Sequence, residues 1–135
     1  MKYRFALSVA VFITLVGPAL VQAQGEQLES TGTGTITVDG KTTNAGFELW
    51  GTDGRTSLIK IDAAGLEVRY SQISMTGYGS DGVSATGEFA PCLDDGVCHC
   101  NLRSDEAETA LTGECSNTAK PGGGLSISVS NIRKQ

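Results

Sequence analysis

The sequence predicts an all-β fold, an antiparallel sandwich or an open barrel or curled sheet of about seven to eight short strands. The first indication is a period-two alternation of apolar and polar residues, clearest over 125–130, which places successive side chains on opposite faces of a sheet. The second is a series of Asp-Gly pairs at 39–40, 53–54, 81–82 and 95–96. Asp-Gly tolerates the positive φ angles of tight hairpin turns, so these pairs are expected to connect neighbouring strands.

The alternation also locates individual strands along the chain. Its phase changes between residues 70 and 73, and a one-residue slip reverses every side chain, so a bulge or turn is expected near Ser71. Residues 104–110 fit either a short helix capped by Ser104 or Asp105, or an edge strand. The segments predicted as strands in this way are 66–70, 73–75, 83–89, 109–115 and 125–130.

Residues 1–23 have the features of an export signal. Lys2 and Arg4 precede an apolar run from Phe5 to Val16, and Val21-Gln22-Ala23 is a small-x-small cleavage pattern. We expect removal of this segment after Ala23, which leaves one β-rich domain over 24–135. The apolar run is shorter than the ~20 residues that cross a bilayer, so the processed protein is not expected to span a membrane. The expected location is secreted or periplasmic.

The predicted mature domain is acidic. Loss of Lys2 and Arg4 reduces ten basic residues to eight against fifteen acidic ones, a net charge near −7. No basic stripe accompanies this charge, so nucleic acid is not an expected partner.

Four cysteines, Cys92, Cys98, Cys100 and Cys115, cluster in the last third of the chain. In an exported protein such a cluster predicts disulfides, with Cys92 bonded to Cys98 or Cys100 and the other of these bonded to Cys115. Closing the larger loop is worth about 3 kcal/mol in the chain-entropy model. The sequence therefore predicts a C-terminal third stabilised by disulfides.

The same segment supports a metal site as an alternative. Cys92, Cys98, His99, Cys100 and Cys115 would offer thiolates and an imidazole to zinc or copper(I). Adjacent side chains of an extended strand point to opposite faces, however, so His99 would face away from its cysteine neighbours. The prediction is therefore disulfides, with no metal and no other cofactor.

Enzyme chemistry has little support in the sequence. His99 is the only histidine and lies among the cysteines, which leaves no free histidine for a catalytic triad. A small hydrolase built on the acidic residues between Asp94 and Glu108 would need a cleft and a carboxylate with a raised pKa. We expect a non-enzymatic protein with no catalytic residues.

Two aromatic residues beside glycine-rich turns are candidates for ligand binding. Trp50 is followed by the turn at 51–54, and Tyr78 by the turn at 79–82. Aromatic side chains at loop tips are a common means of stacking on sugars or partner proteins. Alternatively, Trp50 covers one end of the core.

Two segments are similar to known families. The succession Gly34 to Lys41, Phe47 to Trp50 and Ser57 to Ile61 resembles the opening strands of exported LolA-like lipoprotein carriers, a resemblance covering 34–61. That family folds as a half-open sheet holding lipid or acyl chains, which implies a carrier of an apolar ligand on a curved sheet. The chain is shorter than that complete fold.

Cys100, Leu111 to Cys115 and Ile127 to Val129 together resemble half of a cyanovirin-type lectin repeat, over residues 100–129. This resemblance implies carbohydrate binding, although the partner repeat is missing. The sequence as a whole predicts an exported binding or surface-structural module. The expected partner is a glycan, a protein or an apolar small molecule, and metal binding is a further alternative.

Overall fold

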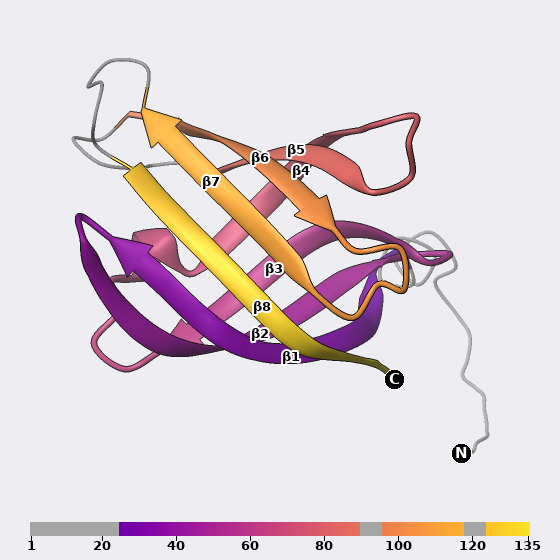
Figure 1. Cartoon of the computed structure of the whole chain (residues 1–135), viewed down its shortest axis with the longest axis horizontal. Helices are drawn as coiled ribbons and strands as arrows, with labels where there is room; N and C mark the ends of the chain where they lie inside the picture. Colours follow the sequence, from indigo (N-terminus) through magenta and orange to yellow (C-terminus); the bar gives the residue numbers. More distant parts are fainter. Residues whose placement is uncertain (1–24, 90–95, 118–123) are drawn as a thin grey trace, which may run out of the picture.

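The computed structural model describes residues 25–89, 96–117 and 124–135, which form a closed antiparallel barrel (Figure 1). Each strand pairs with its neighbours in the sequence, and the last strand pairs with the first. The predicted all-β antiparallel fold is confirmed, and the sheet is closed rather than open. The strands are β1 (Gln27–Val38), β2 (Lys41–Thr52), β3 (Arg55–Ala63), β4 (Gln72–Tyr78), β5 (Ser84–Phe89), β6 (Cys98–Ser104), β7 (Leu111–Asn117) and β8 (Gly124–Lys134).

Tight turns join the first three strands where the sequence predicts them. The pair at 39–40 has φ angles of 53° and 82°, and the pair at 53–54 has 54° and 79°. Two successive positive φ angles are typical of the type I′ turn, whose twist matches that of the flanking strands. The pair at 81–82 lies between β4 and β5, whereas the pair at 95–96 lies partly outside the described residues.

The prediction of a strand over 66–70 is wrong. Residues Val68–Tyr70 form a short 3-10 helix, η1, and Ser71 follows as its C-cap. Tyr70 packs into the barrel with 2% of its surface exposed, while Val68 is 86% exposed. The apolar residues of this segment therefore do not share one buried face, as they would in a strand. The change of phase expected near Ser71 is confirmed, because β4 begins at the next residue.

Residues 104–110 form neither a helix nor a strand along their length. Ser104 ends β6, and the residues after it turn the chain toward β7. The Asp105 carboxylate closes this turn by accepting hydrogen bonds from the N–H groups of Thr109 and Ala110, at 2.7 and 3.1 Å. The Asp105 side chain, a possible helix cap in the sequence, thus bonds to the backbone N–H groups of a turn. Such local hydrogen bonds from aspartate compete with helix formation.

The barrel interior alternates large and small residues. At Gly87 an added Cβ atom would lie 2.8 Å from Cγ2 of Ile73 and 2.9 Å from the carbonyl oxygen of Ser74. Glycine at this inward position therefore lets the neighbouring strands and Ile73 pack closely. The buried core comprises Ile36, Ala45, Phe47, Leu49, Ile59, Ile61, Tyr70, Ile73, Phe89, Cys98, Cys100, Leu102, Cys115, Leu125, Ile127 and Val129.

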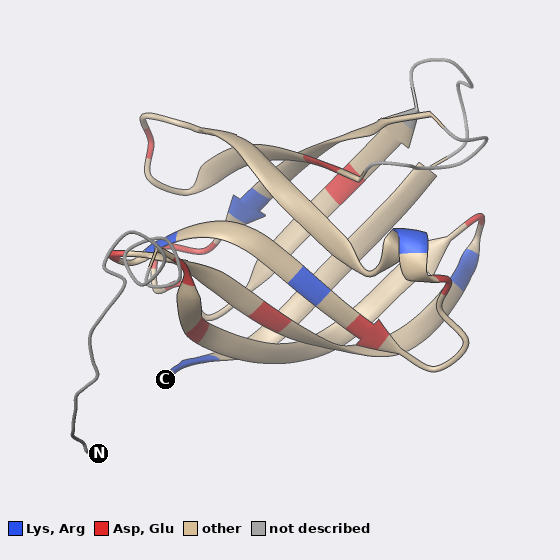
Figure 2. Cartoon of the chain, turned by 180° about the vertical axis from the view of Figure 1, so that it is seen from behind, with Lys and Arg blue, Asp and Glu red and all other residues tan. Residues whose placement is uncertain are grey.

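Charged side chains lie on the outer wall and at the turns. Figure 2 shows acidic residues spread over several strands and turns, with basic residues interspersed among them. Among the described residues, no helix has the length and apolar character needed to cross a bilayer.

Candidate functional site

The two ends of the barrel differ. We call the end that carries the turns at 39–40 and 64–71 the filled end. The open end carries the turns at 53–54, 79–83 and 105–110, and Figure 1 shows that the C-terminus lies at the same end. A cavity of about 550 Å³ occupies the open end, and side chains or backbone from all eight strands line it. Its apolar lining residues are Leu28, Leu49, Ile59, Met75, Val83, Ala85, Leu102, Leu111 and Ile132.

The cavity exists because inward positions near the open end do not fill the barrel. Leu49, Ile59 and Leu102 are buried core residues that also line the cavity, so they form its floor. Above them, Ala85 and Ser30 occupy inward positions with small side chains. An eight-stranded barrel is just wide enough either to be filled by side chains or to hold one small ligand. The small residues at this end favour the second case.

The barrel wall is thin beside the cavity, between β3 and β4. Only Leu58, Ile59 and Lys60 of β3 pair with β4. Farther toward the open end the two strands are joined through Tyr78, whose hydroxyl donates a hydrogen bond to the backbone carbonyl of Thr56. The Arg55 guanidinium lies over the Tyr78 ring, 4.7 Å from its centroid. Tyr78 and Arg55 therefore close this side of the cavity mouth with side chains rather than with ladder hydrogen bonds.

The charges at the rim are arranged unequally. The Lys134 Nζ lies 3.3 Å from Glu108 Oε1, and both residues line the cavity. Glu29 Oε2 accepts a hydrogen bond of 2.8 Å from the N–H of Gly54. Arg55 makes its ring contact with Tyr78 and, among the described residues, contacts no carboxylate. One rim cation is thus left with its N–H groups available.

Ser30 is the one buried polar side chain in the described core, with 8% of its surface exposed. It pairs with Leu49 across β1 and β2, which directs it inward, and it lines the cavity. Within the described part of the chain its hydroxyl has no hydrogen-bond partner. The hydroxyl is accessible from the cavity, where water or a ligand atom can bond to it.

Two aspartates at the open end have lowered pKa values. Hydrogen bonds from the backbone N–H and hydroxyl of Ser84, and from the N–H of Val83, lower the pKa of Asp81 to about 2. The Thr109 hydroxyl and the N–H of Ala110 lower the pKa of Asp105. Both carboxylates therefore act as ionised acceptors that hold turns together. For Asp105, which belongs to the acidic residues of the hydrolase hypothesis, this direction is opposite to the raised pKa required of a general acid.

The aromatic residues singled out in the sequence lie on different surfaces. Trp50 lies on the outer wall of β2, between the buried residues Leu49 and Gly51, and its indole N–H donates to Glu48 Oε1 at 2.9 Å. The Lys60 ammonium lies 4.5 Å from the centroid of its ring. Tyr78, in contrast, lines the cavity mouth and is 45% exposed. The two side chains do not form one platform, and a ligand-binding role for Trp50 stays a prediction.

The described cysteines, Cys98, Cys100 and Cys115, are bonded to sulfur rather than arranged around an ion. Cys100 and Cys115 face each other on β6 and β7 and form a disulfide, one of the pairings that the sequence left open. Cys98 is also disulfide-bonded, and Cys92 lies outside the described residues, as does Asp94 of the acidic cluster. Cys98, Cys100 and Cys115 are buried, whereas His99 is exposed on the outer wall.

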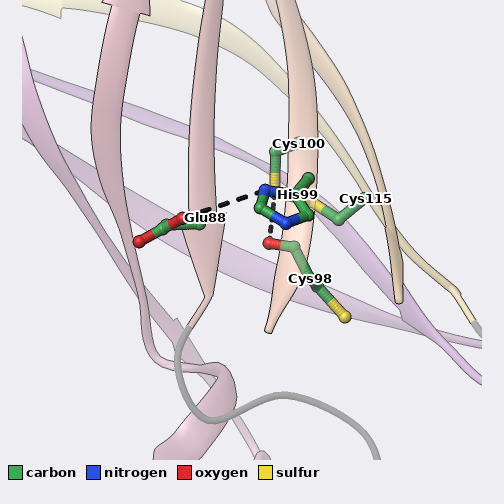
Figure 3. Close-up of a disulfide and its surroundings, with 5 residues drawn as sticks. All are labelled: Glu88, Cys98, His99, Cys100 and Cys115. Atoms are coloured by element: carbon green, nitrogen blue, oxygen red, sulfur yellow. Dashed lines mark hydrogen bonds and ion pairs between the residues drawn. A yellow bond between two sulfur atoms is a disulfide. The ribbon is translucent and has the colours of Figure 1, made fainter. Parts of the chain in front are cut away.

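His99 has a carboxylate neighbour rather than a sulfur ligand. Its Nδ1 lies 3.8 Å from Glu88 Oε2, and Figure 3 shows the two side chains facing each other from neighbouring strands. Among the described residues, no group of three or more histidine, cysteine or acidic side chains is placed to hold a metal ion. The described members of the alternative metal site are therefore divided between the two faces of the sheet, with Cys98, Cys100 and Cys115 inside the barrel and His99 outside.

Sequence reasoning missed most of the cavity. It identified Tyr78 but not Ser30, Arg55, Met75 or Ile132, since inward direction depends on strand register. A signal was present in the small residues that occupy alternating positions of predicted strands, such as Ala85 in 83–89. Comparisons with protein-family models, with curated proteins and with solved structures found no match to this chain. The LolA-like and cyanovirin-type resemblances therefore stay predictions.

Proposed function

We propose that the protein is an exported, non-enzymatic binding protein that takes a small apolar or amphipathic molecule into the cavity at the open end. The observation that carries this proposal is a preformed cavity of about 550 Å³ with an apolar floor and a polar rim. Small-molecule sites typically measure roughly 300–1,000 Å³ and combine an apolar lining with a few polar groups, often at the mouth of a barrel. The disulfide between Cys100 and Cys115 accords with export to an oxidising compartment.

The driving force is burial of apolar surface. Transfer of a ligand tail from water to the cavity gains about 25 cal/mol for each Å² of apolar surface removed from water, before the losses of freedom on binding. Met75, Ala85, Leu111 and Ile132 are only partly buried in the empty barrel, so they too lose exposed surface when a ligand binds. Because the closed ladder of eight strands surrounds the cavity before a ligand binds, little ordering is needed on binding.

Titration with N-phenyl-1-naphthylamine, a neutral apolar fluorophore, tests the proposal. The dye brightens in an apolar site, and decanol should displace it by competition. The matched variants are Ala85→Phe, which fills the cavity, and Thr86→Phe, which adds the same ring to the next, exposed residue of β5. We expect the first variant to lose dye binding and the second to keep it. Absence of saturable binding by the native protein would contradict the proposal.

A further inference from the structure

We infer that the ligand is an anionic amphiphile, a monocarboxylate with an apolar tail, whose carboxylate is bound at the rim by Arg55. This inference rests on the function proposed above and specifies the chemical class of the ligand. It starts from the unequal pairing of the rim charges and from the apolar character of the floor.

Arg55 is the rim cation that is free to bind an anion. The other cation that lines the cavity, Lys134, is 3.3 Å from Glu108. In the described part of the chain Arg55 makes no ion pair, although it lines the cavity with its guanidinium over Tyr78. A guanidinium presents a planar fork of N–H groups that matches a carboxylate in bidentate geometry.

Tyr78 holds this guanidinium in place before the ligand arrives. The Arg55 guanidinium carbon lies over the Tyr78 ring, 4.7 Å from the ring centroid, and the Tyr78 hydroxyl is fixed by its hydrogen bond to the carbonyl oxygen of Thr56. Stacking occupies one face of the guanidinium and leaves its N–H edge available. Because the Arg55 side chain is already ordered, it loses less conformational freedom on binding than an unrestrained lysine side chain would. This favours a directional hydrogen-bonded contact with one carboxylate over general attraction of anions.

The interior sets the orientation of the ligand. The floor consists of Leu49, Ile59 and Leu102, and the only buried polar side chain described there is Ser30. A carboxylate placed among these residues would lose its hydration without gaining a cation. The charged group therefore stays at the rim beside Arg55, and the apolar tail extends inward past Ser30 toward the floor.

Competition between matched ligands tests the inference. Decanoate and decanol have the same chain length and differ in the charged group, and both are used to displace N-phenyl-1-naphthylamine. We expect the native protein to bind decanoate about tenfold more tightly than decanol. This is the difference in affinity expected from one charge-assisted hydrogen bond between the carboxylate and Arg55. Arg55→Gln should remove this preference, leaving decanol affinity unchanged, and Arg55→Lys should keep only part of it. Raising the salt concentration should weaken decanoate binding alone.

Lys60→Gln is the matched control. Like Arg55→Gln, it removes one positive charge and one contact between a cation and an aromatic ring. The Lys60 contact, 4.5 Å from the centroid of the Trp50 ring, lies on the outer wall and outside the cavity. We expect this variant to keep the preference for decanoate, and circular dichroism verifies that each variant is folded.

The outcomes separate the two proposals. If neither the dye nor decanol binds, the proposed function is contradicted and this inference falls with it. If both bind while decanoate and decanol compete equally, or if Arg55→Gln keeps the preference, the binding function stands and the carboxylate assignment is overturned.

Discussion

The filled end and the open end of the barrel are built from the same eight strands, yet their interiors differ. At the filled end, inward positions carry large residues such as Phe47, Tyr70 and Phe89, each at most 2% exposed. At the open end, Ser30 and Ala85 take such positions and Met75 is only partly buried. The comparison teaches that backbone pairing alone does not decide whether a small barrel has a core or a cavity; the size of the inward side chains does.

The difference also separates stability from binding. Burial of large residues is concentrated at the filled end, where the disulfide lies, while the open end keeps apolar surface available for a ligand. Substitutions at the filled end should therefore mainly lower the free energy of unfolding. Substitutions at the open end should mainly change the affinity for the ligand.

Shortening a side chain gives the largest expected contrast between the ends. Phe89→Ala removes a ring that is 0% exposed, and we expect it to lower the free energy of unfolding by about 3–5 kcal/mol. Met75→Ala, which enlarges an existing cavity, should have less than half of that effect. Urea unfolding monitored by circular dichroism measures both. Equal losses would show that the open end is packed as tightly as the filled end.

Removal of the Cys100–Cys115 disulfide tests the filled end by another route. The bridge joins residues separated by 15 positions, and Cys100→Ala/Cys115→Ala should lower the free energy of unfolding by about 3 kcal/mol. Since neither cysteine lines the cavity, the folded fraction should bind N-phenyl-1-naphthylamine with native affinity. Loss of dye binding by folded protein would mean that the two ends are not independent.

Ser30→Ala should have a smaller effect. The hydroxyl lines the cavity, where water can bond to it, so its removal should change the free energy of unfolding of the empty protein by less than about 1 kcal/mol. Thr31→Ala, one residue along the same strand, is the control. Destabilisation by clearly more than about 1 kcal/mol relative to this control would contradict the expectation.

The smallest expected effect concerns the turn of Asp81 at the open end. Its hydrogen bonds lower the pKa from 3.8 to about 2, so the folded pKa lies below the unfolded one. The resulting stabilisation is complete above about pH 4 and is lost as the pH falls toward 2. The midpoint of thermal unfolding of Asp81→Asn should thus lie below that of the native protein at neutral pH. This difference should narrow at acid pH, and a constant difference would contradict the assignment.

The fold could be predicted from the sequence to a larger extent than the cavity. Alternation over 125–130 and the Asp-Gly turns are local signals, and both correspond to observed elements. Closure of the barrel depends on pairing between β1 and β8, such as that of Ile36 with Ile127, which no local pattern shows.

Tyr78 illustrates why the site was harder to predict. Strict alternation from Ile73 and Met75 would turn Tyr78 outward. The register instead shifts between Met75 and Gly77, after which Tyr78 pairs with Ala85, an inward residue of β5. One extra residue in a strand reverses the face of every side chain that follows. Such a bulge leaves no mark in residue type alone, so an inward aromatic residue at the mouth could not be assigned from sequence.

The burial of the Cys100–Cys115 bridge has a consequence for its chemistry. The two residues are 2% and 4% exposed, and thiol–disulfide exchange requires a thiolate to reach one of the sulfur atoms. Reductants in the surroundings therefore meet this bond only when β6 and β7 separate from their neighbours. The half-life of the bridge in glutathione is then set by the frequency of that local opening.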